Sequence, residues 1–183
     1  NRSVFGNTTN VLNMLAEHPY CKAADDSINS YANNKTDVKA SDTVKSENEK
    51  RLVSLFKRVH SAFPEYVEVY LGTKWGGYAT NFDGFMSAGY DPRKRGWYIS
   101  ATENHGKRII TNAYLSTVGD VVVCLSKSVD SPSNEHIGNV SIEVTLNQLT
   151  DMISKFKIGK TGHVMLVQGD NTILADRVNK IGR

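Results

Sequence analysis

A change of periodicity at Pro64 constrains the fold of this chain more than any other feature. Before Pro64, apolar residues recur at helical intervals. After it, they alternate with polar residues or form short continuous runs, as in β-strands. Residues 107–116 and 120–129 flank Thr117-Val118-Gly119, a pattern that predicts a hairpin. The predicted strands are residues 65–72, a strand that begins at residues 78–80, and residues 107–116, 120–129 and 138–146.

The first predicted strand, EYVEVYLG, alternates clearly. Its residues divide between two faces, with Tyr66, Glu68 and Tyr70 on one and Val67, Val69 and Leu71 on the other. A turn follows at residues 72–77.

Two longer helices precede the strands. Residues 4–17 are expected to be the end of a long helix that breaks at His18-Pro19, because a residue before proline avoids the helical region. Ser46 and Glu49 match a capping box that opens a second helix, whose apolar face is Leu52, Leu55, Phe56 and Val59. Short helices are expected near residues 24–32, 95–103 and 146–156. Helices followed by an antiparallel meander predict an α+β fold in which the helices pack against a central sheet.

Composition excludes several classes of protein. The net charge is only +3, from 22 Lys and Arg against 19 Asp and Glu, and the cations are scattered, so no nucleic-acid partner is expected. No apolar run is long enough to span a bilayer, and the chain begins without Met; we expect a soluble protein or a soluble piece of a larger one. Cys21 and Cys124 exclude a disulfide-dense scaffold and a four-cysteine zinc site. Two buried free thiols are the favoured interpretation, and a single bridge stays open.

Motifs for catalysis are missing from the sequence. The five histidines are dispersed, and neither HExxH, GxSxG nor a phosphate-binding glycine loop occurs. We therefore expect neither an enzyme nor a metal or cofactor.

Residues 89–98, GYDPRKRGWY, are the strongest candidate for a binding site. Arginine offers a rigid fork of donors for a carboxylate, and Trp97 and Tyr98 add an apolar wall with N–H and O–H donors. The loop can therefore close a pocket over a small anionic or zwitterionic molecule. The alternative is that Trp97 and Tyr98 only anchor a helix to the sheet while Arg93, Lys94 and Arg95 are solvated.

The segment YDPRKRGWYISA closely resembles the hallmark of double Cache (dCache) domains, the extracytoplasmic sensors of bacterial chemoreceptors and some sensor kinases. TNAYLSTVGDVVVCLSKSV, GNVSIEVTLNQLTDMI and IGKTGHVMLVQGDNTILAD resemble later parts of the family in the right order, so the resemblance covers roughly residues 65–176. It implies a long N-terminal helix and a PAS-like antiparallel sheet, the Cache module. The implied organisation is a helical stalk with its connecting helix at residues 1–60, a membrane-distal module at 61–156, and the start of a truncated membrane-proximal module at 157–183.

The resemblance also implies a ligand site. In the amino-acid-binding branch of the family, Tyr90, Arg95, Trp97 and Tyr98 match the side of the pocket that holds the ligand's carboxylate, and Tyr114 matches a tyrosine of a later strand. Two family aspartates that clasp the ammonium group are replaced here by Ser116 and Glu143. The carboxylate half is thus intact, and the ammonium half is altered. An amino acid bound with altered selectivity, a carboxylate without an amine, a ligand contacted through water, and an unused pocket all fit.

The expected function is the extracytoplasmic ligand-binding domain of a transmembrane chemoreceptor that binds a small carboxylate ligand non-covalently, an amino acid foremost. The resemblance implies a homodimer through the N-terminal helix and a membrane anchor elsewhere in the receptor. Within the same class, the alternatives are a sensor of a histidine kinase or cyclic-dinucleotide enzyme, or a sensor of an organic acid, amine or purine. A hydrolase and a surface interaction module are alternatives of a different class.

Overall fold

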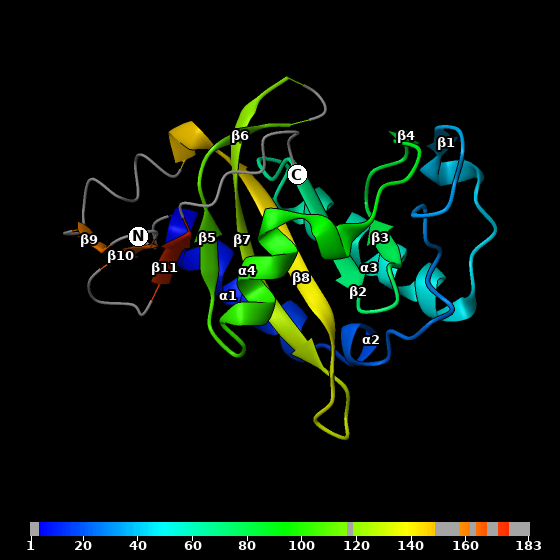
Figure 1. Cartoon of the computed structure of the whole chain (residues 1–183), viewed down its shortest axis with the longest axis horizontal. Helices are drawn as coiled ribbons and strands as arrows, with labels where there is room; N and C mark the ends of the chain where they lie inside the picture. The colour runs from blue at the N-terminus through cyan, green and yellow to red at the C-terminus, as the bar shows by residue number, and fades with distance from the viewer. Residues whose placement is uncertain (1–3, 117–118, 149–157, 162–163, 168–171, 176–183) are drawn as a thin grey trace.

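The structure is a computed structural model that describes residues 4–116, 119–148, 158–161, 164–167 and 172–175. A central sheet organises these residues (Figure 1). Its strands follow one another across the sheet in the order β3-β2-β8-β7-β5-β11-β10-β9, and β6 pairs with β7 beside this path. Their bounds are β2 Glu68–Thr73, β3 Tyr78–Thr80, β5 Ile109–Thr111, β6 Tyr114–Leu115, β7 Val121–Asp130, β8 His136–Thr145, β9 Ile158–Thr161, β10 Val164–Val167 and β11 Thr172–Ala175.

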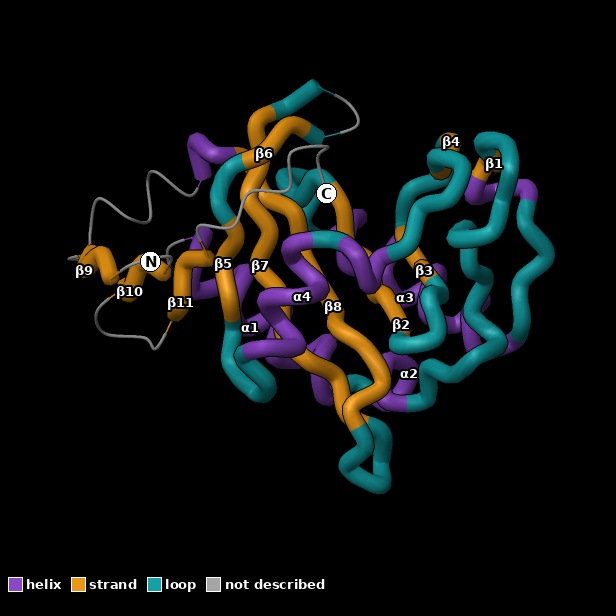
Figure 2. Tube along the Cα trace, in the orientation of Figure 1, coloured by secondary structure: helices purple, strands orange, loops and turns teal. Residues whose placement is uncertain are grey.

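Helices cover both faces of the sheet. On one face lie α1 (Val4–Glu17) and α3 (Glu47–Ala62), and on the other lies α4 (Gly96–Glu103), which stands in front of the sheet in Figure 1. The remaining elements are α2 (Pro19–Lys22), the 3-10 turns η1 (Ala40–Asp42) and η2 (Pro92–Lys94), and a small pair of strands, β1 (Val38–Lys39) and β4 (Phe85–Met86). Figure 2 shows the loop-rich region that carries β1 and β4 beside the β3 end of the sheet. The α+β prediction is confirmed.

The two faces of the sheet bury different kinds of side chain. Under α1 and α3 the core is aliphatic, with Leu52 and Phe56 of α3 packed against Val69, Leu71 and the strands beside them. Under α4 the core is aromatic and polar, and it includes Tyr70, Tyr78, Trp97 and Cys124. All six residues of β2 are buried, so its alternation separates two covered faces rather than a core from solvent.

The helices predicted at residues 4–17 and after Ser46 are confirmed, with one local difference. Ser46 caps α3 by accepting a hydrogen bond from the Glu49 N–H over 3.1 Å. The Glu49 carboxylate, however, accepts the Asn29 N–H at 2.7 Å, so this side chain ties the preceding loop to the helix. α1 ends at Glu17, as the His18-Pro19 break predicts.

The helix expected near residues 24–32 is wrong. The short helix in this region is α2, which ends at Lys22, and the following residues form turns and one bridge between Ser30 and Gly77. The Asp25 carboxylate accepts the Ser27 N–H at 3.0 Å. Such local side-chain bonds compete with the helical backbone pattern, which is why a polar stretch of this kind forms turns.

Several predictions lie partly outside the described residues. β6 and β7 form the predicted hairpin, with Leu115 opposite Val121, but Thr117 and Val118 of its turn are not described. Residues 146–148 begin the predicted helix, and residues 149–157 are not described. β10 and β11 pair antiparallel as expected around residues 168–171, which are not described, and β11 also pairs parallel with β5. The assignment of residues 157–183 to a second module stays a prediction.

Candidate functional site

The loop that leads into α4 is held by an internal ion pair. Asp91 accepts the Arg93 N–H at 3.0 Å, and the Arg93 guanidinium binds both Asp91 oxygens, with Nε–Oδ1 2.9 Å and Nη2–Oδ2 3.0 Å. Burial acts to raise the pKa of Asp91, but the hydrogen bonds and charge of Arg93 outweigh it and lower this pKa below its ordinary value. Arg93 therefore stabilises the conformation of the loop.

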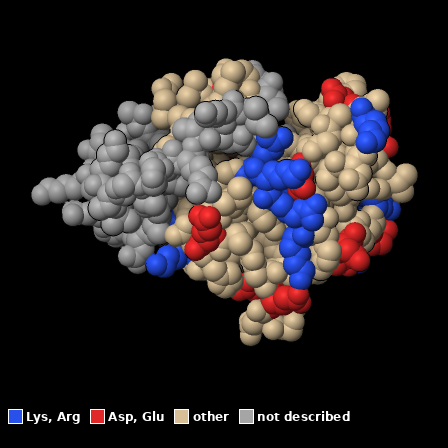
Figure 3. All heavy atoms as spheres, in the orientation of Figure 1, with Lys and Arg blue, Asp and Glu red and all other residues tan. Residues whose placement is uncertain are grey.

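Arg95 is in a different environment. It is half-buried, and its guanidinium carbon lies 4.9 Å from the centroid of the Tyr90 ring, a cation–π contact. Its Nε is buried and has no hydrogen-bond partner among the described residues. Lys94, between the two arginines, is exposed. On this side of the molecule, Lys and Arg atoms form a band across the surface (Figure 3). Of the three cations of the loop, Arg95 is the one with a buried N–H that has no acceptor among the described residues.

Trp97 and Tyr98 open α4 and are buried, with exposed fractions of 2% and 7%. The Trp97 ring meets Tyr70 of β2 edge to face at 4.9 Å between centroids. The Trp97 Nε1 is buried, and the described residues supply no acceptor for it. Burial raises the pKa of the Tyr98 hydroxyl to about 12. Trp97 and Tyr98 do anchor the helix, as one of the two interpretations holds. Arg95, however, is half-buried, whereas that interpretation requires it to be fully solvated.

Glu143 lies on the sheet face beneath α4. It is 1% exposed, and its Oε1 accepts hydrogen bonds from the hydroxyls of Tyr114 at 2.7 Å and Tyr70 at 3.4 Å. Cys124 lies on β7 opposite Glu143 of β8, and its Sγ is 3.1 Å from the Tyr70 hydroxyl oxygen. Burial raises the pKa values of Tyr70 and Tyr114 well above the ordinary range, and the nearby Cys124 and Glu143 raise them further. Tyr70, Tyr114, Cys124 and Glu143, which come from four strands, thus form one buried polar cluster.

A second carboxylate on the same face was not predicted. Glu68 pairs in register with Glu143 across β2 and β8, and it accepts hydrogen bonds from the hydroxyls of Tyr78 and, at 2.7 Å, Thr80. Directly opposite residues of an antiparallel pair share a face. The alternation of residues 65–72 already put Glu68 on the same face as Tyr70, so the available sequence signal was an acidic residue beside a tyrosine on one face of a strand.

Ser116 does not reach this cluster through any contact seen among the described residues. Its hydroxyl accepts the Asp120 N–H at 3.1 Å, and its own N–H donates to the Asp120 carbonyl at 2.8 Å. The residue therefore closes the β6–β7 hairpin. The structure brings Tyr90, Arg95, Trp97 and Tyr98 together in and beside the α4 lid and places Tyr114 with Glu143 on the sheet, while Ser116 lies at the end of β6.

The two cysteines are both free and buried. Cys21 lies in the aliphatic core and Cys124 in the aromatic core, so the sheet separates them. Burial raises the pKa of each thiol to about 12. The free-thiol interpretation is confirmed.

A Cache domain model matches residues 9–182. The chain belongs to the Cache domain family. Among its relatives, the methyl-accepting chemotaxis protein McpA of Pseudomonas putida is 36% identical over 110 residues, which are 60% of this chain and 17% of that protein. McpB of Bacillus subtilis is 27% identical over 136 residues, 74% of this chain and 20% of that protein. The Cache domain chain thus spans about a fifth of the length of these curated relatives.

Solved structures agree with the fold. The ligand-binding domain of the Pseudomonas aeruginosa chemoreceptor PctC, in complex with GABA, gives a TM-score of 0.56 at 20% identity over 81% of this chain and 58% of that one. The ligand-binding domain of the Campylobacter jejuni chemoreceptor Tlp3, in complex with 4-methylisoleucine, gives a TM-score of 0.55 at 18% identity over 86% of this chain and 54% of that one. Within the described part of the Cache domain chain, no helix is long and apolar enough to cross a membrane.

Proposed function

We propose that this Cache domain is the extracytoplasmic ligand-binding part of a transmembrane chemoreceptor, and that a small carboxylate, an amino acid foremost, binds where residues 90–98 and α4 cover the sheet. One observation carries the proposal. The buried N–H groups of Arg95 Nε and Trp97 Nε1 have no acceptor among the described residues. A buried donor left without an acceptor costs about 1–3 kcal/mol, which a bound carboxylate would recover.

The two halves of an amino acid find complementary partners here. Arg95 would pair with the carboxylate, with Tyr90, Trp97 and Tyr98 around it, and Glu143 would pair with the ammonium. Because a buried ammonium is costly unless it is paired, the Glu143 carboxylate with its Tyr114 and Tyr70 donors is the suitable acceptor. GABA, bound to PctC, and 4-methylisoleucine, bound to Tlp3, each carry one amine and one carboxylate. Ser116 would contribute to the shape of the pocket through the hairpin.

Binding would be non-covalent and would act by selecting one position of α4. The buried Asn139 side chain on β8 holds this helix by donating to the Tyr98 carbonyl at 3.1 Å and the Thr102 hydroxyl at 2.9 Å. A ligand that contacts both α4 and the sheet would favour the arrangement in which both sets of contacts form. The sheet packs against α1 on its other face, so α1 is the element that would carry the signal. A homodimer through α1, and an anchor in the membrane outside this chain, belong to the same proposal.

Thermal unfolding in the presence of candidate ligands tests the proposal. The panel contains L-amino acids, small carboxylic acids, amines and purines. A ligand at about 100 times its Kd stabilises the fold by roughly 2.7 kcal/mol, or several degrees in Tm for a domain of this size. We expect shifts with amino acids or carboxylic acids. Shifts confined to amines or purines would contradict the roles of Arg95 and Glu143, and no shift with any compound would contradict direct sensing of small molecules.

A further inference from the structure

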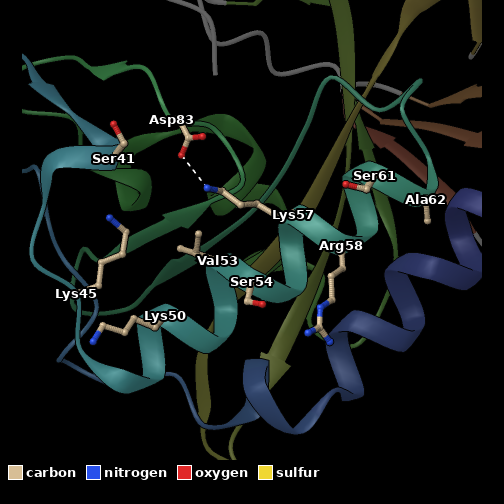
Figure 4. Close-up of a pocket in the computed structure, with 10 residues that line it drawn as sticks. All are labelled: Ser41, Lys45, Lys50, Val53, Ser54, Lys57, Arg58, Ser61, Ala62 and Asp83. Atoms are coloured by element: carbon tan, nitrogen blue, oxygen red, sulfur yellow. Dashed lines mark ion pairs between the residues drawn. The ribbon is translucent and has the colours of Figure 1, made fainter.

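An open groove of about 820 Å³ runs along the outer side of α3, on the face of the sheet opposite α4 (Figure 4). Its α3 wall consists of residues spaced three and four apart, which share one side of a helix. From Lys50 to Ala62 this wall is about 18 Å long at a rise of roughly 1.5 Å per residue. The facing wall consists of Ser41 of η1, Lys45 from the loop between η1 and α3, and Asp83 from the loop after β3. The groove is therefore elongated, with an irregular loop along one side.

The charge of the groove is predominantly positive. Lys45, Lys50, Lys57 and Arg58 line it against the single carboxylate of Asp83, which lies 3.0 Å from the Lys57 ammonium. Lys45 donates to the Ala40 carbonyl and the Thr43 hydroxyl, which holds it at the rim. The exposed guanidinium of Arg58 makes no hydrogen bond or ion pair with any described residue.

The basic surface continues past α3. A second hollow of about 510 Å³ begins on the other side of the same helix and shares Lys50, Ser54 and Arg58 with the groove. Its remaining lining includes Arg51, which is also exposed and has no ion-pair partner in the described ranges. The exposed side of α3 is therefore rich in cations, with a hollow along each flank; among them Lys50 also pairs with the exposed Glu47 at 3.1 Å.

The arrangement of the cations indicates the kind of occupant. In Figure 4, Lys45 and Lys50 lie at one end of the groove, Lys57 turns towards Asp83, and Arg58 points to the other flank of α3. Charged groups that do not converge on one point fit anionic groups spaced along a chain better than one small anion. The half-buried Val53 and the exposed Ala62 offer apolar contact between the cations. A second copy docked here by a two-fold axis would bring the same cations together, which disfavours self-association.

We propose that the α3 groove is a docking site for an acidic amphipathic segment of another protein, with its carboxylates against Lys50, Lys57 and Arg58 and its apolar side against Val53 and Ala62. A segment of about three helical turns matches the length of the wall, and a helix laid in a groove is a common form of peptide recognition. The site is separate from the ligand site beneath α4 and does not depend on the function proposed for that site.

Selection from a random library of displayed peptides, each about 16 residues long or roughly four helical turns, tests this proposal directly. The chain itself is the bait. Sequences that are acidic and amphipathic should be enriched, and synthetic versions should bind more weakly as the salt concentration rises from about 0.05 M to about 0.5 M. Enrichment of sequences without an acidic bias would overturn the proposal, and so would a failure to enrich any sequence.

Three variants locate the binding. Lys50→Glu with Arg58→Glu reverses two exposed charges of the groove and should weaken peptide binding at least about tenfold. Ser54→Trp, at an exposed position that lines both hollows, should block it without changing charge. Lys35→Glu with Lys107→Glu is the matched control, because both lysines are exposed and line neither hollow. Equal binding to all variants would contradict the site. Each variant should keep the wild-type Tm in the absence of peptide, so a loss of binding is not a loss of fold and the result is independent of the proposed sensing function.

Discussion

Arg93 and Arg95 stand two residues apart and have different partners. The Arg93 guanidinium donates to both oxygens of the Asp91 carboxylate. Arg95 instead lies over the Tyr90 ring, and its buried Nε has no acceptor among the described residues. The sequence GYDPRKRGWY contains all of these groups, but it does not say which cation the aspartate takes. That choice depends on η2, whose turn brings the Arg93 N–H and side chain back to Asp91.

Replacing Asp91 with Asn should destabilise the domain in a pH-dependent way. The pKa of Asp91 is lowered in the folded state, so its contribution to the free energy of unfolding is present above the unfolded pKa of about 3.9 and is lost as the pH falls through the folded pKa. We expect Asp91→Asn to cost about 1–2 kcal/mol at pH 7, with the difference from wild type shrinking below about pH 4. Urea unfolding across this pH range measures it. Asp26→Asn, at an exposed position, is the control, and a constant difference at all pH values would contradict the assignment.

Replacing Glu143 with Gln should separate the two halves of the ligand site. The change removes the negative charge while keeping an acceptor for the Tyr114 hydroxyl. We expect affinity for an amino acid to fall by about 10- to 100-fold, because an ammonium loses its buried counter-charge, and affinity for the same acid without the amine to change little. Calorimetric titration with the matched pair of ligands measures this, with the exposed Glu135→Gln as control. Equal losses of affinity for both ligands would show that Glu143 does not bind the ammonium group.

Among the elements, the sequence predicts the helices and strands whose apolar residues recur at the spacing of their packed face. α3 follows from the spacing of Leu52, Phe56 and Val59 and from the Ser46 cap, and α4 and β8 lie where they were expected. The predictions that failed also have physical causes. Residues 24–32 form turns because Asp25 bonds locally, and Glu68 was missed because alternation assigns a face but does not say that α4 covers it. The Ser116 hydroxyl is bonded to Asp120 by the register of a hairpin that sequence alone leaves open.

The contact between the α4 lid and β2 depends on a glycine. A Cβ added at Gly72 would lie 2.7 Å from the Pro92 Cβ and 2.9 Å from the Trp97 ring, so the loop and helix would have to move away from the strand. We expect Gly72→Ala to lower the free energy of unfolding by about 1–3 kcal/mol and to weaken ligand binding as well, since it displaces the Trp97 wall. Chemical unfolding and ligand titration of the same variant check both effects. A variant with wild-type stability and affinity would show that the lid does not need this close approach.

At the scale of the whole molecule, the sheet separates two surfaces with different chemistry. One face holds the aromatic and acidic cluster beneath α4, and the other holds the aliphatic core beneath α1 and α3, with the basic groove beyond it. The order of elements and the family could be inferred from residues 65–176 of the sequence, whereas the basic groove could not. Its lining comes from two loops and a helix, and nothing in the spacing of Ser41, Lys45 and Asp83 shows that they meet α3.

In the proposed site, Arg95 anchors the carboxylate of a ligand held between α4 and the sheet. Isothermal titration of the amino acid that gives the largest thermal shift, into wild type, Arg95→Ala and Lys94→Ala, tests it most directly. Lys94 is the matched control, since it is a cation of the same loop that is exposed to solvent. We expect the affinity to fall by about 100-fold or more in Arg95→Ala, because a charge-assisted pair is removed, and to stay nearly unchanged in Lys94→Ala. Wild-type affinity in a folded Arg95→Ala would contradict it.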